Sequence, residues 1–165
     1  MKNKIQDSNP PKLKILFVCL GNICRSSCAE SVMRYKLEAY GLNTKVEVDS
    51  AGLIDYHEGE LSDSRMIYHA KQRGYFLTHR SRPICREDFR RFDLIIGMDD
   101  SNINRLRSLC KNSNEMNKIH KMTEYSIKYS VDSVPDPYYG TSQSFENVLD
   151  LLEDACEGLI QSLDV

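Results

Sequence analysis

The segment Leu13 to Cys19, with the sequence LKILFVC, constrains the fold of this chain more than any other segment. It is short for a helix, and an apolar run of this length is typical of a strand buried in a sheet. A short loop follows, and apolar residues then recur at helical spacing, at Ala29, Val32, Met33 and Leu37, until Gly41 offers a natural helix stop. The chain therefore opens with a strand, a loop and a helix.

The same alternation continues along the chain. Further strands are predicted at residues 46–50, 92–98 and 118–122. Further helices are predicted at residues 63–73, from the caps Asp99 and Ser101 to Leu109, and at residues 145–163, with a polar connection at residues 110–117. Strands that alternate with helices imply right-handed crossovers, so we expect an α/β fold with a mainly parallel sheet and helices on both faces.

A chain of 165 residues is most economically one domain, which we place at residues 13–165. Residues 1–12 are polar and carry two prolines, so we expect a flexible arm there. Lys14 interrupts the first apolar stretch, which argues against a signal sequence, and no apolar run is long enough for a membrane span. A formal charge of -2 argues against general binding to nucleic acid.

The six cysteines show no repeated spacing, which argues against a secreted disulfide scaffold and favours a reducing cytoplasm. Cys19, Cys24 and Cys28 are close in sequence, yet there is no CxxC pair and no histidine nearby. We therefore predict no metal site and no cofactor. The loop also lacks the GK[ST] of a nucleotide-binding phosphate loop.

The loop LGNICRSS, which follows Cys19, has the features of an oxyanion cradle. Such a loop in a parallel sheet turns backbone N–H groups toward ligands beyond the carboxyl ends of the strands. Gly21 and Asn22 tolerate backbone angles that other residues resist, and the planar guanidinium of Arg25 suits phosphate oxygens. The arginine and the helix N-terminus favour a thiolate at Cys19, to which Ser26 would donate a hydrogen bond.

A second candidate segment, VPDPYYG, covers residues 134–140. Two prolines restrict the backbone around Asp136, which makes its carboxyl group a candidate general acid for protonating a departing oxygen. Tyr138 and Tyr139 follow directly and would line a slot for an aromatic leaving group. Alone, such a segment is more often an ordinary turn, and its weight comes from being paired with the Cys19 loop.

The segments CLGNICRS and DPYYG resemble those of the low molecular weight protein tyrosine phosphatases. The segments CAES after the loop, DSAG at Asp49 and EDFRRFDLIIGMDDSN at Glu87 are similar to family segments and occur in family order, so the resemblance extends over nearly the whole chain from Lys14. It implies an open, Rossmann-like, four-stranded parallel sheet with flanking helices. It also implies a metal-independent, two-step hydrolysis of phosphotyrosine in protein or peptide substrates. A monomer is expected, with weak self-association left open.

The same resemblance implies a role for individual residues. Cys19 would be the nucleophile that forms a phosphocysteine, Arg25 the phosphate clamp, and Asp136 the acid that later activates water. Ser26 would assist the thiolate. The backbone N–H groups that would hold the equatorial oxygens belong to Leu20, Gly21, Asn22, Ile23, Cys24 and Arg25. A hydrogen-bond network that shapes the loop would be formed by Asn22, Ser50 and His79, and the entrance would be lined by Tyr56, Tyr138 and Tyr139. Without the family, His79 and Tyr56 would be assigned ordinary packing or surface roles.

Two positions in the loop call for separate comment. Cys24 matches a family cysteine that forms a reversible disulfide with the nucleophile, although a packing role is equally compatible with the sequence. Ser27 stands where most family members carry a proline at the helix start. Ser27 and Glu30 have the spacing of a capping box, so we expect a small loss of rigidity rather than of activity. The other four cysteines are expected to be structural thiols.

Three alternatives differ in activity. Protein-arginine phosphatases resemble this loop but tend to have threonine at the position of Ile23, so the isoleucine and the paired tyrosines favour phosphotyrosine. A thioredoxin-coupled arsenate reductase needs two further cysteines close together, whereas Cys85 and Cys110 are far apart in the sequence. A phosphotyrosine-binding module without turnover would not need the nucleophile, the clamp and the acid together.

Overall fold

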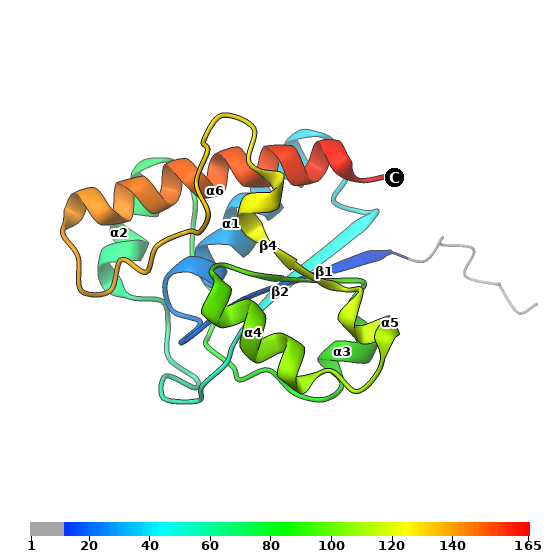
Figure 1. Cartoon of the computed structure of the whole chain (residues 1–165). Coiled ribbons are helices and arrows are strands. Elements are labelled where there is room, and N and C mark those ends of the chain that lie inside the picture. Colours follow the sequence, from blue (N-terminus) through cyan, green and yellow to red (C-terminus); the bar gives the residue numbers. More distant parts are fainter. Residues whose placement is uncertain (1–11) are drawn as a thin grey trace, which may run out of the picture.

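The computed structural model describes residues 12–165, so the expected arm at residues 1–12 lies outside the described residues except for Lys12. A four-stranded sheet forms the middle layer (Figure 1). Its strands lie in the spatial order β2 (Val46–Gly52), β1 (Leu13–Cys19), β3 (Leu94–Gly97) and β4 (Ile119–Lys121). Every neighbouring pair is parallel, so the predicted α/β fold with a four-stranded parallel sheet is confirmed.

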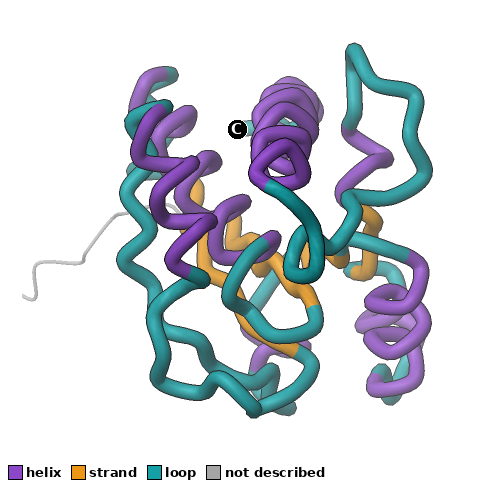
Figure 2. The backbone as a smooth tube through the Cα atoms, turned by 90° about the vertical axis from the view of Figure 1, so that its left-hand side faces the viewer, coloured by secondary structure: helices purple, strands orange, loops and turns teal. Residues whose placement is uncertain are grey.

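Helices cover both faces of this sheet, as the two views in Figure 1 and Figure 2 show. One face carries α1 (Arg25–Ala39), α2 (Ser64–Gln72) and α6 (Ser142–Ser162), with the 3-10 helix η1 (Met122–Tyr125) against α6. The other face carries α3 (Asp88–Arg91), α4 (Asp100–Leu109) and α5 (Ser113–Met116). In the described part of the chain, no helix combines the length and the apolar character that a membrane crossing needs.

The alternation of side chains along β1 explains the layers. Ile15 and Phe17 belong to the apolar core under α1, α2 and α6, whereas Leu16 and Val18 pack on the opposite face with residues of α4. All four side chains are fully buried. Burying a side chain of this size stabilises a fold by about 1.5–3 kcal/mol, so the central strand fixes the position of the loop that follows it.

The start of α1 differs from the expectation. The helix begins at Arg25, so Ser27 lies inside its first turn and forms no capping box with Glu30. Cys24 precedes the helix and makes no side-chain cap. The Ser27 hydroxyl instead accepts a hydrogen bond from Ser62 Oγ at 2.8 Å, and both side chains are buried. The loop before α1, rather than a cap, therefore sets where the helix begins.

The observed bounds of other helices and strands also differ from the predicted ones. The expected polar connection at residues 110–117 contains α5, whose first turn is capped by Asn112 through the N–H of Glu115. The strand predicted at residues 92–98 is shorter, because Phe92 ends the short helix α3. Asp99 caps α4 as expected, whereas Ser101 lies inside that helix.

Candidate active site

The loop between β1 and α1 lies at the carboxyl end of the central strand, where ligands bind in open parallel sheets. Asn22 has a φ of 57°, the left-handed region that asparagine tolerates. Within residues 12–165, no backbone N–H of residues 20–24 donates a hydrogen bond to another protein group. These N–H groups and the N-terminus of α1 form a cradle that suits an oxyanion.

Gly21 serves this loop in a different way from the one expected. Its φ does not lie in the left-handed region, so no unusual backbone angle requires glycine there. A Cβ atom at this position would instead lie 3.2 Å from Cδ2 of His57. Gly21 thus lets the side chain of His57 pack closely over the loop.

Cys19 is buried at the end of β1, with its Sγ 3.0 Å from Ser26 Oγ. Asn22 Nδ2 donates to that Ser26 oxygen at 2.8 Å and to Ser50 Oγ at 3.0 Å. Because Asn22 donates to the oxygen of Ser26, the hydroxyl hydrogen of Ser26 is left for the sulfur. The arrangement therefore presents a hydrogen-bond donor to a thiolate at Cys19.

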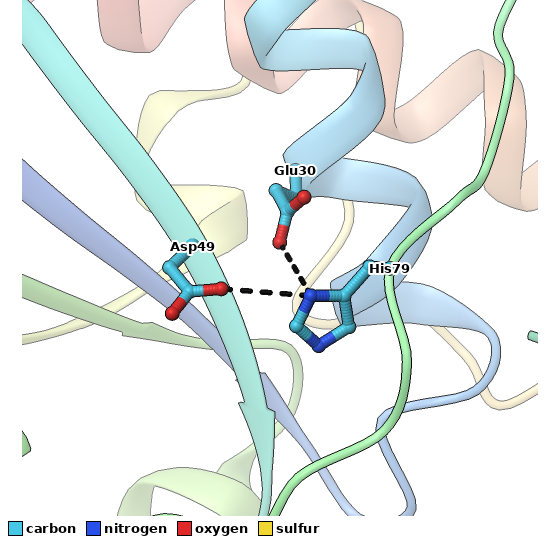
Figure 3. A group of neighbouring side chains, drawn as sticks. All are labelled: Glu30, Asp49 and His79. Atoms are coloured by element: carbon cyan, nitrogen blue, oxygen red, sulfur yellow. Dashed lines mark ion pairs between the residues drawn. The ribbon is translucent and has the colours of Figure 1, made fainter. Parts of the chain in front are cut away.

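His79 supports Asn22 from the other side of the loop. The Nε2 atom of His79 lies 2.9 Å from Asn22 Oδ1, and its Nδ1 atom lies 3.2 Å from Glu30 Oε1 and 3.5 Å from Asp49 Oδ1 (Figure 3). Ser50 Oγ donates to Glu30 at 3.0 Å. Burial raises the pKa of Glu30, although His79 acts in the opposite direction. The structure thus brings the predicted network together and extends it to two carboxylates.

Glu30, Asp49 and His79 are also a group whose ligand atoms could hold a metal ion, since these atoms lie within 4.8 Å of one another. Their oxygens already have protein partners. Arg82 Nη2 pairs with Asp49 Oδ2 at 3.1 Å, and Ser50 donates to Glu30. We therefore assign the group to the hydrogen-bond network behind the loop.

Arg25 lies at the base of the site and is 3% exposed. Its Nη1 atom donates to Asp99 Oδ2 at 2.6 Å and to the carbonyl of Val134 at 3.0 Å, while its Nη2 atom lies 3.6 Å from Asp136 Oδ2. Burial acts to lower the pKa of Arg25, but the charges of Cys19, Asp99 and Asp136 outweigh burial and raise it. The guanidinium is therefore a fixed positive fork beside the cysteine.

Cys19, Arg25 and Asp136 line one pocket of about 380 Å³. Asp136 lies at its mouth and is partly exposed, so it can reach both a bound molecule and water. Tyr138 and Tyr139 form one wall, with their ring centres 4.9 Å apart in an edge-to-face arrangement, although Tyr139 is 96% exposed. The lining residues are Cys19, Leu20, Gly21, Ile23, Cys24, Arg25, Ile54, Tyr56, His57, Asp136, Tyr138 and Tyr139.

Cys24 lines the same pocket as Cys19 and is buried. Burial raises the pKa of the Cys24 thiol far above its usual range, so this residue is a thiol at neutral pH. All six cysteines of the chain are free. Cys28 and Cys156 are also buried, whereas Cys85 is exposed.

The site includes groups that no sequence motif identified. Asp99 was expected only as a helix cap, yet it also holds Arg25. The position of Asp99 just after β3 could have indicated that it lies at the site, because the carboxyl ends of parallel strands share one edge of the sheet. His57 and Ile54 come from an irregular loop, and no local pattern in the sequence could have placed them at the pocket.

Comparison with known proteins gives consistent results. The family model for low molecular weight phosphotyrosine protein phosphatase matches residues 14–165. A Synechocystis protein provisionally described as a low molecular weight protein-tyrosine-phosphatase is 44% identical, covering 92% of this chain and 96% of the relative. A Streptomyces coelicolor low molecular weight protein-tyrosine-phosphatase is 38% identical, covering 91% and 93%. A crystal structure of a protein tyrosine phosphatase from Entamoeba histolytica, with Hepes in its active site, has a TM-score of 0.90 and 46% identity, covering 93% and 97%.

Proposed function

The chain belongs to the low molecular weight phosphotyrosine protein phosphatase family and is a protein-tyrosine phosphatase, and on this basis we propose that it hydrolyses phosphotyrosine through a phosphocysteine formed on Cys19. One observation carries the proposal. Cys19, Arg25 and Asp136 line one pocket, with the guanidinium 3.6 Å from the carboxylate. Nucleophile, phosphate clamp and proton donor are thereby within reach of one bound phosphate group.

In the first step, the thiolate of Cys19 attacks the phosphorus atom, and the bond from phosphorus to the phenolic oxygen breaks. The carboxyl group of Asp136 gives its proton to that oxygen, so tyrosine leaves as a neutral phenol. The backbone N–H groups of residues 20–24 and the guanidinium of Arg25 hold the other phosphate oxygens. Such a general acid typically accelerates a step by about 10² to 10⁴.

In the second step, the Asp136 carboxylate takes a proton from a water molecule, and the water oxygen attacks the phosphorus of the phosphocysteine. The S–P bond breaks and inorganic phosphate is released. Ser26, whose Oγ lies 3.0 Å from Cys19 Sγ, donates to the departing thiolate. Neither step uses a metal ion.

The pocket walls support the preference for an aromatic leaving group. Tyr138 and Tyr139 offer ring faces and edges to the pocket, and Tyr56, which is 80% exposed, is also one of the lining residues. Aromatic pairs in such arrangements gain about 0.5–1.5 kcal/mol beyond the burial of their area. The side chains of Asn22, Ser50 and His79 support the loop from behind.

We further propose that Cys24 protects the nucleophile. Peroxide would oxidise the Cys19 thiolate to a sulfenic acid with release of hydroxide, and the Cys24 thiol would then attack the sulfenic sulfur and release water to form a disulfide. Both cysteines line the pocket, which supports this role. Reduction by a cellular dithiol would restore the active thiolate.

The expected setting and partners form part of the same proposal. Six free cysteines support a reducing cytoplasm. We expect activity as a monomer, with weak self-association left open. Tyrosine-phosphorylated proteins or peptides are the proposed partners, and the formal charge of -2 argues against general binding to nucleic acid.

The test uses Cys19→Ser, with the exposed Cys85→Ser as its matched control. We expect Cys19→Ser to lose turnover of a phosphotyrosine peptide and of 4-nitrophenyl phosphate while it still binds vanadate or phosphate, and Cys85→Ser to match the wild type. Phosphoserine and phosphoarginine peptides should be poor substrates of the wild type. Turnover by Cys19→Ser at the wild-type rate, or loss of wild-type activity with a chelator, would contradict the mechanism.

A further inference from the structure

Arg65 occupies a position that local helix preferences disfavour. It lies in the first turn of α2, directly after Ser64, where the helix dipole disfavours a cation. Its guanidinium folds back onto the N-cap residue Asp63, with Nε 3.0 Å from Oδ1 and Nη2 2.8 Å from Oδ2. The bonds from Arg65 hold the pKa of Asp63 below its usual range. Residues that depart from local structural preferences are expected at functional sites, so the position of Arg65 points to a function.

The same guanidinium reaches the loop that carries Asp136. Nη2 of Arg65 donates to the carbonyl oxygen of Tyr138 at 2.9 Å. The guanidinium carbon lies 5.6 Å from the ring centre of Tyr138 and 4.8 Å from that of Phe145, a buried residue in the first turn of α6. Arg65 therefore lies between the aromatic wall of the pocket and the start of the last helix.

Hydrogen bonds continue from Arg65 in both directions. On one side, the N–H of Tyr138 donates to Asp136 Oδ1 at 3.1 Å. On the other side, the N–H of Asp63 donates at 2.8 Å to the carbonyl of Ile23, which lies in the loop of residues 20–24 between β1 and α1, here called the anion loop. A continuous series of contacts thus joins the anion loop to the carboxyl group of Asp136 through Arg65.

The loop at residues 135–140 has few other ties. Among the described residues, the bond from Arg65 is the only hydrogen bond between this loop and another segment of the chain. The Arg25–Asp136 contact, at 3.6 Å, is an ion pair to a partly exposed carboxylate. The orientation of Tyr138 therefore depends on Arg65, and Asp136 is linked to Arg65 through Tyr138, whose N–H donates to the Asp136 carboxylate.

We propose that Arg65 is the positioning residue for the general acid. By holding the carbonyl and the ring of Tyr138, it sets the direction of the Asp136 carboxyl group relative to the anion loop. This inference rests on the proposed function, in which Asp136 protonates the leaving oxygen. Arg65 is not among the residues that line the pocket, so its effect passes through Tyr138.

The leaving group distinguishes this role from a general structural one. Proton transfer requires hydrogen-bond geometry between acid and leaving oxygen, and a small displacement weakens it sharply. Phenol is a poor leaving group and needs the proton, whereas 4-nitrophenolate departs readily without one. Loss of Arg65 should therefore slow the two aryl phosphates unequally.

The experiment compares kcat/KM for phenyl phosphate and 4-nitrophenyl phosphate in four variants. Arg65→Met removes the donors at similar length, Arg65→Lys keeps the charge without the fork, and Asp136→Asn removes the acid. Arg90→Met is the matched control, because Arg90 is 68% exposed on α3. We expect Arg65→Met to lose about tenfold on phenyl phosphate and less than about twofold on 4-nitrophenyl phosphate. The kcat/KM of Arg65→Lys for phenyl phosphate should lie between that of Arg65→Met and that of the wild type, and Arg90→Met should match the wild type on both substrates.

A double variant completes the test. In Arg65→Met combined with Asp136→Asn, the unequal loss due to Arg65 should disappear, since the acid it positions is gone. Equal losses on both substrates in Arg65→Met, or no loss, would overturn the role of Arg65 if Asp136→Asn still discriminates between them. Equal losses in Asp136→Asn itself would overturn the general acid and the positioning role together. Partial unfolding of a variant slows both substrates by one factor, so it does not imitate the expected result.

Discussion

Arg25 and Asp99 form an ion pair, with Nη1 2.6 Å from Oδ2, that joins the first residue of α1 to the N-cap of α4. The same carboxylate accepts a hydrogen bond from the N–H of Asn102 through its other oxygen, Oδ1, at 2.8 Å. One side chain therefore orients the proposed phosphate clamp and also caps a helix.

Two substitutions of Asp99 separate these tasks. Asp99→Asn keeps a capping side chain and loses the charge beside Arg25, whereas Asp99→Ala loses both. We expect kcat/KM to fall roughly tenfold in both variants, because a charge-assisted hydrogen bond is worth about 1.5–3 kcal/mol. Urea unfolding should show Asp99→Ala to be less stable than Asp99→Asn by about 1 kcal/mol. Wild-type kcat/KM in Asp99→Asn would show that the pair does not orient the clamp.

Asn22 allows the backbone of the loop to be tested apart from its hydrogen bonds. Both Asn22→Gly and Asn22→Ala lose the bonds to Ser26 and Ser50, but only glycine adopts a φ of 57° without strain. We expect both variants to lose activity, with Asn22→Ala less stable than Asn22→Gly by about 1–2 kcal/mol. This order is the reverse of the usual effect of glycine on stability. Thermal unfolding measures it, and equal stabilities would contradict the left-handed conformation.

Gly158 permits the close crossing of α6 and η1. A Cβ atom at this position would lie only 1.8 Å from the carbonyl oxygen of Tyr125. Glycine to alanine in a helix interior normally stabilises by about 1 kcal/mol, but overpacking against a backbone costs about 1–3 kcal/mol or more. Gly158→Ala should therefore lower the free energy of unfolding, whereas Asn147→Ala, at an exposed position of the same helix, should change it by less than about 0.5 kcal/mol. A higher free energy of unfolding in Gly158→Ala than in the wild type would contradict the close packing of Gly158 against Tyr125.

The pairing of Asp63 with Arg65 gives stability a dependence on acid pH. The bonds from Arg65 lower the pKa of Asp63 in the folded protein, so the pairing stabilises the fold above the unfolded value of about 3.9. That contribution is lost as the pH falls through the lower folded pKa. Asp63→Asn retains a helix cap without a titrating group, so its stability should fall less steeply below about pH 4 than that of the wild type. Urea unfolding at several pH values measures the two slopes, and parallel profiles would contradict the pairing.

Local patterns in the sequence were sufficient for the central strand, the loop after it and the order of strands and helices. Ile15 and Phe17 lie on one face of the strand, and Leu16 and Val18 lie on the other. Because both faces are apolar, the sequence predicts a strand that is buried on both sides. The character of the anion loop was equally local, because Asn22 and Arg25 are close neighbours of Cys19 in the chain. The role of Asp136 needed more than local pattern, since its segment alone reads as a turn.

The tertiary structure decided which distant groups meet. Asp99 reaches Arg25, Glu30 and Asp49 meet at His79, and Arg65 holds Tyr138, each across a large separation in sequence. No local preference encodes such contacts, because they arise from how the helices pack on the two faces of the sheet. The helix start at Arg25 has the same origin: the loop geometry prevailed over the capping signal at Ser27. The sequence alone thus determined the fold and the choice of the proposed reacting groups, and only packing decided what orients them.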